Sequence, residues 1–448
     1  MTEFEIRDDF ELRAYSIKDK KFKDYTPQEI SSAVSYFEIK IKDIPAEEGK
    51  TLGIAFGFLG PIQLFLMLAI IRSGRDYTIF YCGTDFLNQK MVEEKCYHMF
   101  LAGPWQTDIY GLEYPYVDYD EFIKSLTKPE MYTELFDATV EEEAITCDKV
   151  PYNPKHSFRY EQKVYINFNT GHEPQLAYNT GRIEDSCTRA AMEHYYSSTD
   201  VVALVRPFRH IGVGTLSIYP AVFKAKKLIL CTWQKDWEQE ALGDEVTHIH
   251  VPYELLRDQW KIPKKLRMLT SGGYNFTKEY VNYLRSVSEI DNVVDCYGTS
   301  YCPPPLAIRR LNKDDTEFSE FTWVNDFIKP LSTLFLTCDD PRAFGTESTQ
   351  LALMESGLVK TNDLISTGPF KFIGSHYNYV RVKDIRISDI NFENFLKNTS
   401  SIENFVLKFV YINGVKEPVL ELEEQYKEEF EKLVSEHAIE IKVNYVTN

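Results

Sequence analysis

The stretch RMLTSGGYNFTKEYVNYLRSVSEIDNVVDCYGTSYCPPPLAIRR, residues 267–310, decides the fold of this chain. Its pattern predicts a turn at Ser271-Gly272-Gly273, because glycine lets the main chain approach a partner closely. A helix capped by Thr277 follows, with apolar residues at helical spacing. The apolar run at residues 293–297 then predicts a buried strand that ends at Gly298-Thr299-Ser300. Ligands of open α/β sheets bind where strands end, so this pattern predicts a ligand site; an ordinary surface turn and helix–strand link is the alternative.

The composition limits the classes of function. The 448 residues suffice for two or three domains, and 44% hydrophobic residues with 14% aromatics predict a globular protein. A net charge of -18 argues against a nucleic-acid partner, which requires clustered Lys and Arg. The eight cysteines show no CxxC and no zinc spacing, so we predict reduced thiols in a cytoplasmic protein and no structural metal site.

One apolar run, residues 52–71, has the length of a membrane helix. Glycines and Pro61 interrupt it, so the prediction is a strand at Leu52–Phe58 and a buried helix that begins with Pro61. The charged start of the chain, MTEFEIRDDFELRAY, lacks the apolar core of a signal peptide. We therefore expect no membrane partner.

The pairing of Ser-Gly-Gly at 271–273 with Tyr-Gly-Thr at 297–299 resembles the adenylate-forming ligase superfamily. That superfamily comprises acyl- and aryl-CoA ligases, peptide-synthetase adenylation domains and luciferases. In it, the glycine turn and the strand end hold adenine and the region of the α-phosphate. The residues that the resemblance implies for nucleotide binding here are Gly272, Gly273, Tyr297, Gly298 and Thr299.

A second segment resembles the superfamily's phosphate loop. The apolar strand Val164–Phe168 leads into Asn169-Thr170-Gly171, small and polar residues whose N–H groups suit phosphate oxygens. Gln175 stands where the superfamily has a lysine. The window Tyr178–Arg182 is a second candidate for this loop and supplies an arginine, and a plain strand followed by a turn is a third interpretation.

Two further residues are carried over from the resemblance. Residues 201–210 form an apolar strand ending in Pro-x-x-His, like the superfamily's segment beside the acyl pocket, which implies a catalytic or substrate-lining role for His210. Thr361-Asn362-Asp363-Leu364 resembles Thr-Gly-Asp-Leu, so Asp363 is expected to accept hydrogen bonds from both ribose hydroxyls. An acidic residue in a hairpin turn is the alternative for Asp363.

The resemblance also predicts the domain organisation. The fold class is α/β, with a large multi-sheet α/β N-terminal domain at 1–375 and a small α+β C-terminal lid domain at 376–448. The hinge is expected near Gly374–Asn378. Lys442 lies in an alternating strand pattern and is not predicted to be catalytic.

The activity implied is ATP-dependent adenylation of a carboxylic acid, followed by acyl transfer to a thiol, an amine or a hydroxyl. ATP is the implied cosubstrate, and Tyr301 replaces the glutamate that holds Mg²⁺ in the superfamily. Gln175 and Ser375 likewise replace cationic residues, so any active enzyme would need Arg182, Arg206, Arg209 or the Arg309-Arg310 pair instead. The alternative is a catalytically degenerate relative that binds a nucleotide or acyl ligand, or that acts as a scaffold with a protein partner or a second copy.

Overall fold

The computed structural model describes the chain in segments. These are residues 4–16, 21–56, 60–79, 96–102, 134–136, 163–169, 174–204, 213–230, 243–250, 263–272, 282, 285–286, 290–299, 302–315, 318–319, 321–324, 333–337, 349–354, 358–367, 370–375, 379–382, 385–402, 404–412 and 415–446. The chain divides into two compact units, one of residues 1–168 with 174–328 and one of residues 169–173 with 329–448.

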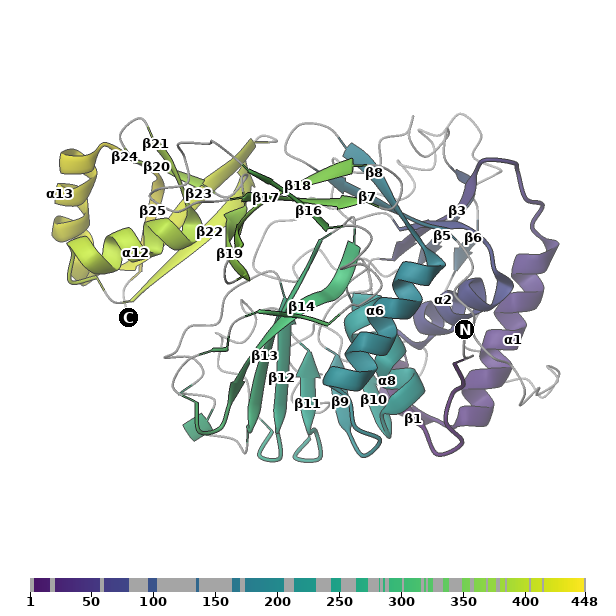
Figure 1. Ribbon diagram of the computed structural model, residues 1–448. Helices are drawn as coiled ribbons and strands as arrows, with labels where there is room; N and C mark the ends of the chain where they lie inside the picture. The colour runs from purple at the N-terminus through teal and green to yellow at the C-terminus, as the bar shows by residue number, and fades with distance from the viewer. Residues whose placement is uncertain are drawn as a thin grey trace. The chain divides into compact units, whose positions relative to one another are not determined.

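The first unit contains a nine-stranded sheet (Figure 1). In spatial order its strands are β15 (Thr322–Trp323), β14 (Cys302–Asn312), β13 (Asn292–Thr299), β12 (Met268–Gly272), β11 (His248–His250), β9 (Val201–Leu204), β10 (Lys227–Leu230), β1 (Glu11–Ser16) and β2 (Lys21–Tyr25). From β13 to β1 every neighbouring pair is parallel. The carboxyl ends of these strands therefore meet at one edge of the sheet.

A six-stranded sheet completes the first unit. Its order is β6 (Glu134–Phe136), β5 (Cys96–Ala102), β3 (Thr51–Phe56), β4 (Tyr77–Ile79), β7 (Lys163–Asn169) and β8 (Pro174–Thr180). The pairs from β6 to β7 are parallel. Strand β3 confirms the predicted strand from Leu52 to Phe56, and residues 57 and 58 of that prediction lie outside the described residues. Strand β7 contains the predicted strand at 164–168, which is confirmed.

The helices of the first unit follow from local sequence. Helix α1 (Pro27–Asp43) begins with a capping box in which Thr26 and Glu29 exchange hydrogen bonds. Helix α2 (Pro61–Ser73) begins with Pro61, is buried from Pro61 to Ile71, and ends at Gly74, whose φ of 67° suits glycine. The apolar run is thus a strand and a buried helix, as predicted. No helix in the described segments is long and apolar enough to cross a membrane.

Helix α6 (Gly181–His194) and helix α8 (Tyr219–Lys224) lie on one face of the nine-stranded sheet (Figure 1). A π-helical turn, η2 (Gly214–Ile218), precedes α8. A Cβ added to Gly214 would lie 2.8 Å from Cε2 of the Tyr219 ring, so glycine is required where this ring packs on the main chain.

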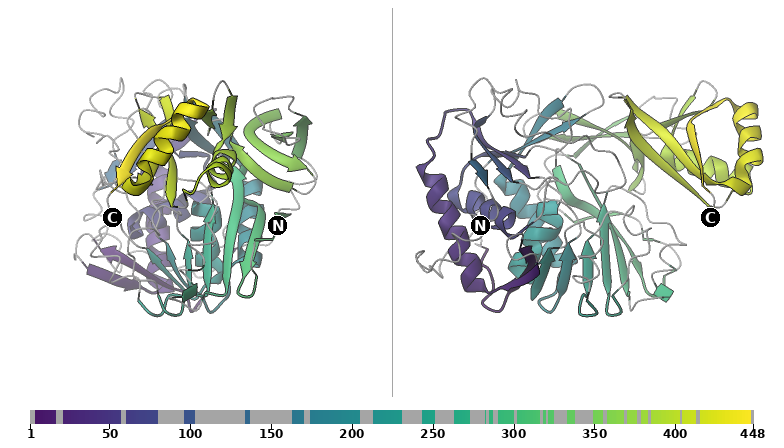
Figure 2. Two further views of the ribbon diagram at one scale, coloured as in Figure 1. Left: turned by 90° about the vertical axis from the view of Figure 1, so that its left-hand side faces the viewer. Right: turned by 180° about the vertical axis from the view of Figure 1, so that it is seen from behind.

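The second unit contains three small sheets, which Figure 2 shows from two further sides in green and yellow. The first sheet has the order β16 (Thr333–Thr337), β17 (Thr349–Met354), β18 (Leu358–Thr367) and β19 (Phe370–Ser375). The second has the order β21 (Ile385–Ser388), β20 (Tyr379–Val382) and β24 (Ile439–Glu440). The third has the order β22 (Phe405–Ile412), β23 (Val415–Glu423) and β25 (Lys442–Val446). Helices α12 (Asp389–Thr399) and α13 (Lys427–His437) contribute Phe392, Leu396 and Phe430 to a core that also includes Val380 and Leu420.

The strands after residue 375 pair only with one another among the described residues. Their sheets and helices form the small α+β region that the sequence predicts. The boundary between 375 and 376 as a domain hinge stays a prediction, because the division into compact units falls near residue 328 instead.

One feature differs from the sequence prediction. Ser271 and Gly272 are the last residues of β12 and not a turn, because they pair with Asp295 and Cys296 of β13. Pairing with a neighbouring strand here overrides the preference of glycine for turns. The strand at residues 293–299 is confirmed as β13, and of the predicted helix only residues 282, 285 and 286 are described, all helical.

Candidate nucleotide site at the carboxyl edge of the sheet

The structure brings Gly272 and the Tyr-Gly-Thr segment to one edge. Gly272 ends β12 and is in register with Cys296 of β13, so Tyr297, Gly298 and Thr299 continue just beyond it. Both strands are parallel, and this edge is where open α/β sheets bind small molecules. Gly273, the next residue of the predicted site, lies outside the described residues.

The end of β13 is irregular in its pairing with β14. Tyr297 pairs with Ala307, but Thr299 pairs with Cys302, so residues 303–306 have only Gly298 opposite them. Three of those four residues are prolines, which have no N–H to donate to a strand ladder. Such bulges re-aim side chains and occur next to functional sites. Tyr297 itself is buried, with 6% of its surface exposed, and Gly298 is half-buried.

Just before this edge, two histidine side chains share the hydroxyl group of one threonine. Thr270 of β12 lies within hydrogen-bonding distance of two histidines of β11: its Oγ1 is 3.1 Å from His248 Nε2 and 2.9 Å from His250 Nδ1. All three residues are buried. Burial lowers the pKa of His248 to about 4, so this imidazole is neutral at pH 7. The sequence analysis did not single out these histidines, although alternate positions in a strand share one face.

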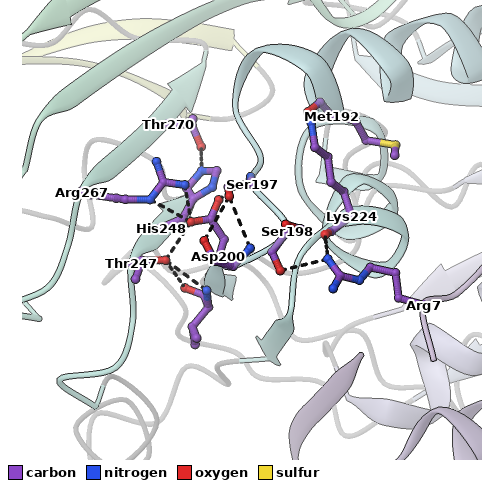
Figure 3. A network of polar contacts seen from close by, with 12 residues as sticks. Arg7, Met192, Ser197, Ser198, Asp200, Lys224, Thr247, His248, Arg267 and Thr270 are labelled. Carbon is purple, nitrogen blue, oxygen red and sulfur yellow. Dashed lines mark hydrogen bonds and ion pairs between the residues drawn. The ribbon is translucent and has the colours of Figure 1, made fainter. Parts of the chain in front are cut away.

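At the amino-terminal end of the same strands, Asp200 is the centre of a second network (Figure 3). Its buried carboxylate accepts hydrogen bonds from Arg267, from the Thr247 hydroxyl at 3.0 Å and from the Ser197 N–H at 2.7 Å. These residues precede or begin β9, β11 and β12. The network therefore fixes the starts of the strands whose other ends carry the candidate site.

The opposite face of β13 carries an ion pair. Arg309 of β14 lies 2.7 Å from the carboxylate of Asp295, and its guanidinium also stacks over the rings of Phe318 and Phe321. Burial raises the pKa of Asp295, and the charge of Arg309 opposes that rise. Arg310 donates a hydrogen bond of 2.6 Å to the carbonyl oxygen of His194. Both arginines already have protein partners.

The remaining cationic candidates are only partly described. Arg206 and Arg209 lie outside the described residues, and Arg182 is in the first turn of α6, where its side chain is not described. Lys442 is in strand β25, as the pattern predicts, and its Nζ is 2.5 Å from the carboxylate of Glu417. No group of three or more His, Cys, Asp or Glu residues that could hold a metal occurs in the described part of the chain.

The predicted phosphate loop connects β7 and β8. Asn169 is the last residue of β7, and β8 begins at Pro174, so Gln175 lies in a strand. Thr170 and Gly171 are outside the described residues. The second window, Tyr178–Arg182, is not a loop: it is the end of β8 followed directly by the first turn of α6.

His210 also lies outside the described residues, between β9 and η2, and so does Tyr301. The roles that the resemblance implies for these two positions stay predictions. The strand before His210 is confirmed as β9 (Val201–Leu204), and Gly214 begins the helical segment after it.

Asp363 belongs to the second compact unit and lies within β18. On one side it pairs with Ser375 of β19. On the other side Gln350 pairs with Leu364 and Ala352 with Lys360, so residues 361–363 bulge opposite Leu351 alone. The alternative of an acidic hairpin-turn residue is wrong, because β18 continues past Asp363 to Thr367. The Thr-Asn-Asp segment is a bulge, as segments beside functional sites often are.

One buried acid was missed by the sequence analysis. Glu184 of α6 is fully buried and accepts a hydrogen bond of 2.9 Å from the Tyr77 hydroxyl. Burial raises the pKa of Glu184 to about 8, so this carboxyl group is mostly protonated at pH 7. Its residue type in an amphipathic helix gives no sign of burial, because acids in such helices usually face solvent.

Comparisons with solved structures identify the fold. The chain is similar to the amide bond synthetase McbA from Marinactinospora thermotolerans, with 14% identity and a TM-score of 0.65 over 95% of this chain and 91% of that one. It is similar to a fatty acyl CoA synthetase of Mycobacterium tuberculosis, with 11% identity and a TM-score of 0.62 over 98% and 91% of the chains. The anthranilate CoA ligase AuaEII in complex with anthranoyl-AMP matches with 10% identity and a TM-score of 0.63 over 95% and 89%. No family model and no curated protein matches the sequence.

Proposed function

We propose that this chain, which has the fold of the adenylate-forming ligases, binds ATP and joins its AMP group to a carboxylic acid. The observation that carries the proposal is the register of β12 with β13, which sets Gly272 beside Tyr297-Gly298-Thr299 at the carboxyl edge of a parallel sheet. The solved structures similar to this chain include synthetases and ligases, one of them bound to an acyl-adenylate.

In the proposed reaction, a carboxylate oxygen of the acid attacks the α-phosphorus of ATP. A new P–O bond forms, the bond between the α-phosphorus and the bridging oxygen breaks, and pyrophosphate leaves. A thiol, amine or hydroxyl then attacks the acyl carbon, loses its proton, and displaces AMP. The protein's contribution is to hold the two reactants in line and to meet the developing charge.

The proposed roles are as follows. Gly272 and Gly273 give the nucleotide close access to the main chain, and Tyr297, Gly298 and Thr299 form the wall beside it. Asp363 accepts hydrogen bonds from the ribose hydroxyls. Asn169, Thr170 and Gly171 contact the outer phosphates, and His210 lines the acyl end of the site. The described residues provide no cluster of ligands for Mg²⁺, and no step is assigned to a protein-bound metal.

A second candidate function is a nucleotide or acyl binder without ligase activity. Arg309 forms an ion pair with Asp295, and Arg310 donates a hydrogen bond to the carbonyl oxygen of His194. These contacts favour the second candidate, because they engage two of the arginines that could neutralise the charge of the phosphates. Loss of one electrostatic group of this kind commonly lowers a rate by about 100-fold or more. The two functions share the nucleotide site and differ in turnover.

The test combines titration calorimetry with pyrophosphate exchange. The wild-type protein is titrated with ATP and AMP, and exchange of labelled pyrophosphate into ATP is followed with a panel of carboxylic acids. Exchange that depends on an acid supports the ligase. Nucleotide binding without exchange supports the binder, and absence of binding to any adenine nucleotide contradicts both the ligase and the nucleotide binder.

If exchange is found, Arg182→Ala, Arg206→Ala and Arg209→Ala identify the cation. We expect one of these variants to lose about 100-fold in exchange rate, because a guanidinium grips phosphate oxygens in pairs. Arg189→Ala is the matched control, since Arg189 forms its ion pair with Asp185 within α6. Pyrophosphate exchange at the wild-type rate in all three variants would show that none of these arginines neutralises the charge that develops on the phosphates.

A further inference from the structure

The ladder between β11 and β12 ends at one residue pair. His250 is the last residue of β11 and is in register with Thr270. Strand β12 continues for two more residues, Ser271 and Gly272, which are in register with β13. Within the described residues, the pair of His250 with Thr270 is therefore the last link to β11 before the candidate nucleotide edge.

A side-chain hydrogen bond reinforces this last pair. Thr270 Oγ1 lies 2.9 Å from His250 Nδ1 and 3.1 Å from His248 Nε2, and all three side chains are buried. The ring of His248 packs against that of Tyr196, with centroids 4.6 Å apart, and the Tyr196 hydroxyl donates to the carbonyl oxygen of Leu216. The cluster is thus anchored at His248 by Tyr196.

The chemistry of the shared hydroxyl links the proton positions of the two histidines. A hydroxyl group has one hydrogen, so Thr270 donates to one imidazole nitrogen and accepts from the other. When Thr270 donates to His250 Nδ1 it accepts from His248 Nε2, and when it donates to His248 Nε2 it accepts from His250 Nδ1. For two neutral imidazoles, either direction gives both histidines the same tautomer, protonated on Nε2 in the first case and on Nδ1 in the second.

We propose that Thr270 is a positioning residue, which through its hydroxyl group, shared by His248 and His250, holds the end of β12 so that Gly272 keeps its place at the sheet edge. Thr270 does not contact the ligand in this proposal. It acts through the main chain two residues away. That the edge takes a nucleotide rests on the proposed function, whereas the fixed strand end and the shared tautomer do not.

The experiment uses the full chain and three variants. Thr270→Val keeps the shape and removes the hydroxyl, Thr270→Ser keeps the hydroxyl, and Thr188→Val is the control. Thr188 is buried in α6, and its hydroxyl has no hydrogen-bond partner in the part of the chain that the structure describes. Hydrogen exchange of peptides covering residues 268–272, nitrogen NMR of labelled histidines and calorimetry with ATP are the readouts.

We expect Thr270→Val to speed exchange at the end of β12 by about tenfold and, where the wild type binds ATP, to weaken that binding by about tenfold. Thr270→Ser and Thr188→Val should stay within about threefold of the wild type in both. In the wild type, the NMR signals of His248 and His250 should be those of one shared tautomer, both Nε2–H or both Nδ1–H.

Unchanged exchange in Thr270→Val, or different tautomers in His248 and His250, overturns the inference. Faster exchange in a protein that binds no adenine nucleotide leaves the positioning role standing and removes the proposed function. If Thr270→Val does not fold, His250→Asn and His250→Leu replace it, because asparagine keeps a hydrogen-bonding group near the Nδ1 position and leucine does not. Equal exchange in those two variants then overturns the inference.

Discussion

The Tyr77 hydroxyl donates a hydrogen bond of 2.9 Å to the carboxyl group of Glu184, and both side chains are fully buried. This contact joins β4 of the six-stranded sheet to α6, which packs on the nine-stranded sheet. Burial raises the pKa of Glu184 from 4.5 to about 8 and also raises the pKa of Tyr77. The pair is therefore uncharged at neutral pH, and its contribution to stability depends on pH.

For an acid whose pKa is higher in the folded state, the stabilisation is fully present below the unfolded pKa and is lost as pH rises through the folded pKa. For Glu184 that window runs from 4.5 to about 8. Glu184→Gln keeps an acceptor for Tyr77 and cannot ionise. We expect the free energy of unfolding of this variant, minus that of the wild type, to increase by a few kcal/mol from about pH 5 to about pH 9. Urea titrations at both pH values measure the difference, and parallel pH profiles would contradict the prediction.

The network around Asp200 should be essential for stability. Asp200→Ala leaves the half-exposed Arg267 side chain, the Thr247 hydroxyl and the Ser197 N–H without their shared acceptor. We expect a loss of about 3 kcal/mol in the free energy of unfolding, measured by urea denaturation. The control is Lys313→Ala, which removes an exposed pair with Asp291 at 4.0 Å and should cost less than about 0.5 kcal/mol. Equal losses in both variants would show that Asp200 is not a structural centre.

Gly214 should not tolerate a larger side chain. In Gly214→Ala the new Cβ would lie 2.8 Å from Cε2 of Tyr219, so the ring or the π-helical turn must shift. We expect a loss of about 1–3 kcal/mol in the free energy of unfolding. Gly243→Ala is the matched control, because the nearest atom to its Cβ is a Glu245 side-chain carbon at 3.9 Å. A melting temperature for Gly214→Ala equal to that of the control would contradict the packing described here.

The proposed ribose contact of Asp363 is tested by comparing two ligands. Asp363→Ala should weaken binding of ATP by about tenfold or more, since a charged hydrogen bond to the diol is lost. The same variant should bind 2′,3′-dideoxy-ATP as the wild type does, because that ligand has no diol. Glu440→Ala, which removes an exposed acid of the same unit, is the control for a change of charge. Equal weakening for both nucleotides would mean that Asp363 does not contact the ribose.

The sequence predicts those elements whose pattern is local. The buried helix from Pro61 and the strand ending at Thr299 are confirmed, because the proline start and the apolar run contain the information that forms them. Ser271 and Gly272 were predicted as a turn, since only pairing with a distant strand makes them extended. Glu184 was missed for a similar reason: its burial is decided by Tyr77, 107 positions away.

The candidate site is predicted only in part. The resemblance predicts Gly272 and the Tyr-Gly-Thr segment in one site, and the register of β12 with β13 sets Gly272 opposite Cys296, next to Tyr297; the binding role of these residues stays a prediction. The alternating histidines in Thr-His-Ile-His, residues 247–250, have the period of two that places side chains on one face of a strand. Their shared partner Thr270 lies on another strand, and no local pattern shows which strands become neighbours.

The most direct test of the account is a crystal structure of the protein with a non-hydrolysable acyl-adenylate analogue. The account predicts that the adenine lies against Tyr297-Gly298-Thr299 and the main chain of Gly272, with the ribose hydroxyls within hydrogen-bonding distance of Asp363. An analogue bound elsewhere on the protein, with the carboxyl edge of β12 and β13 unoccupied, would contradict it.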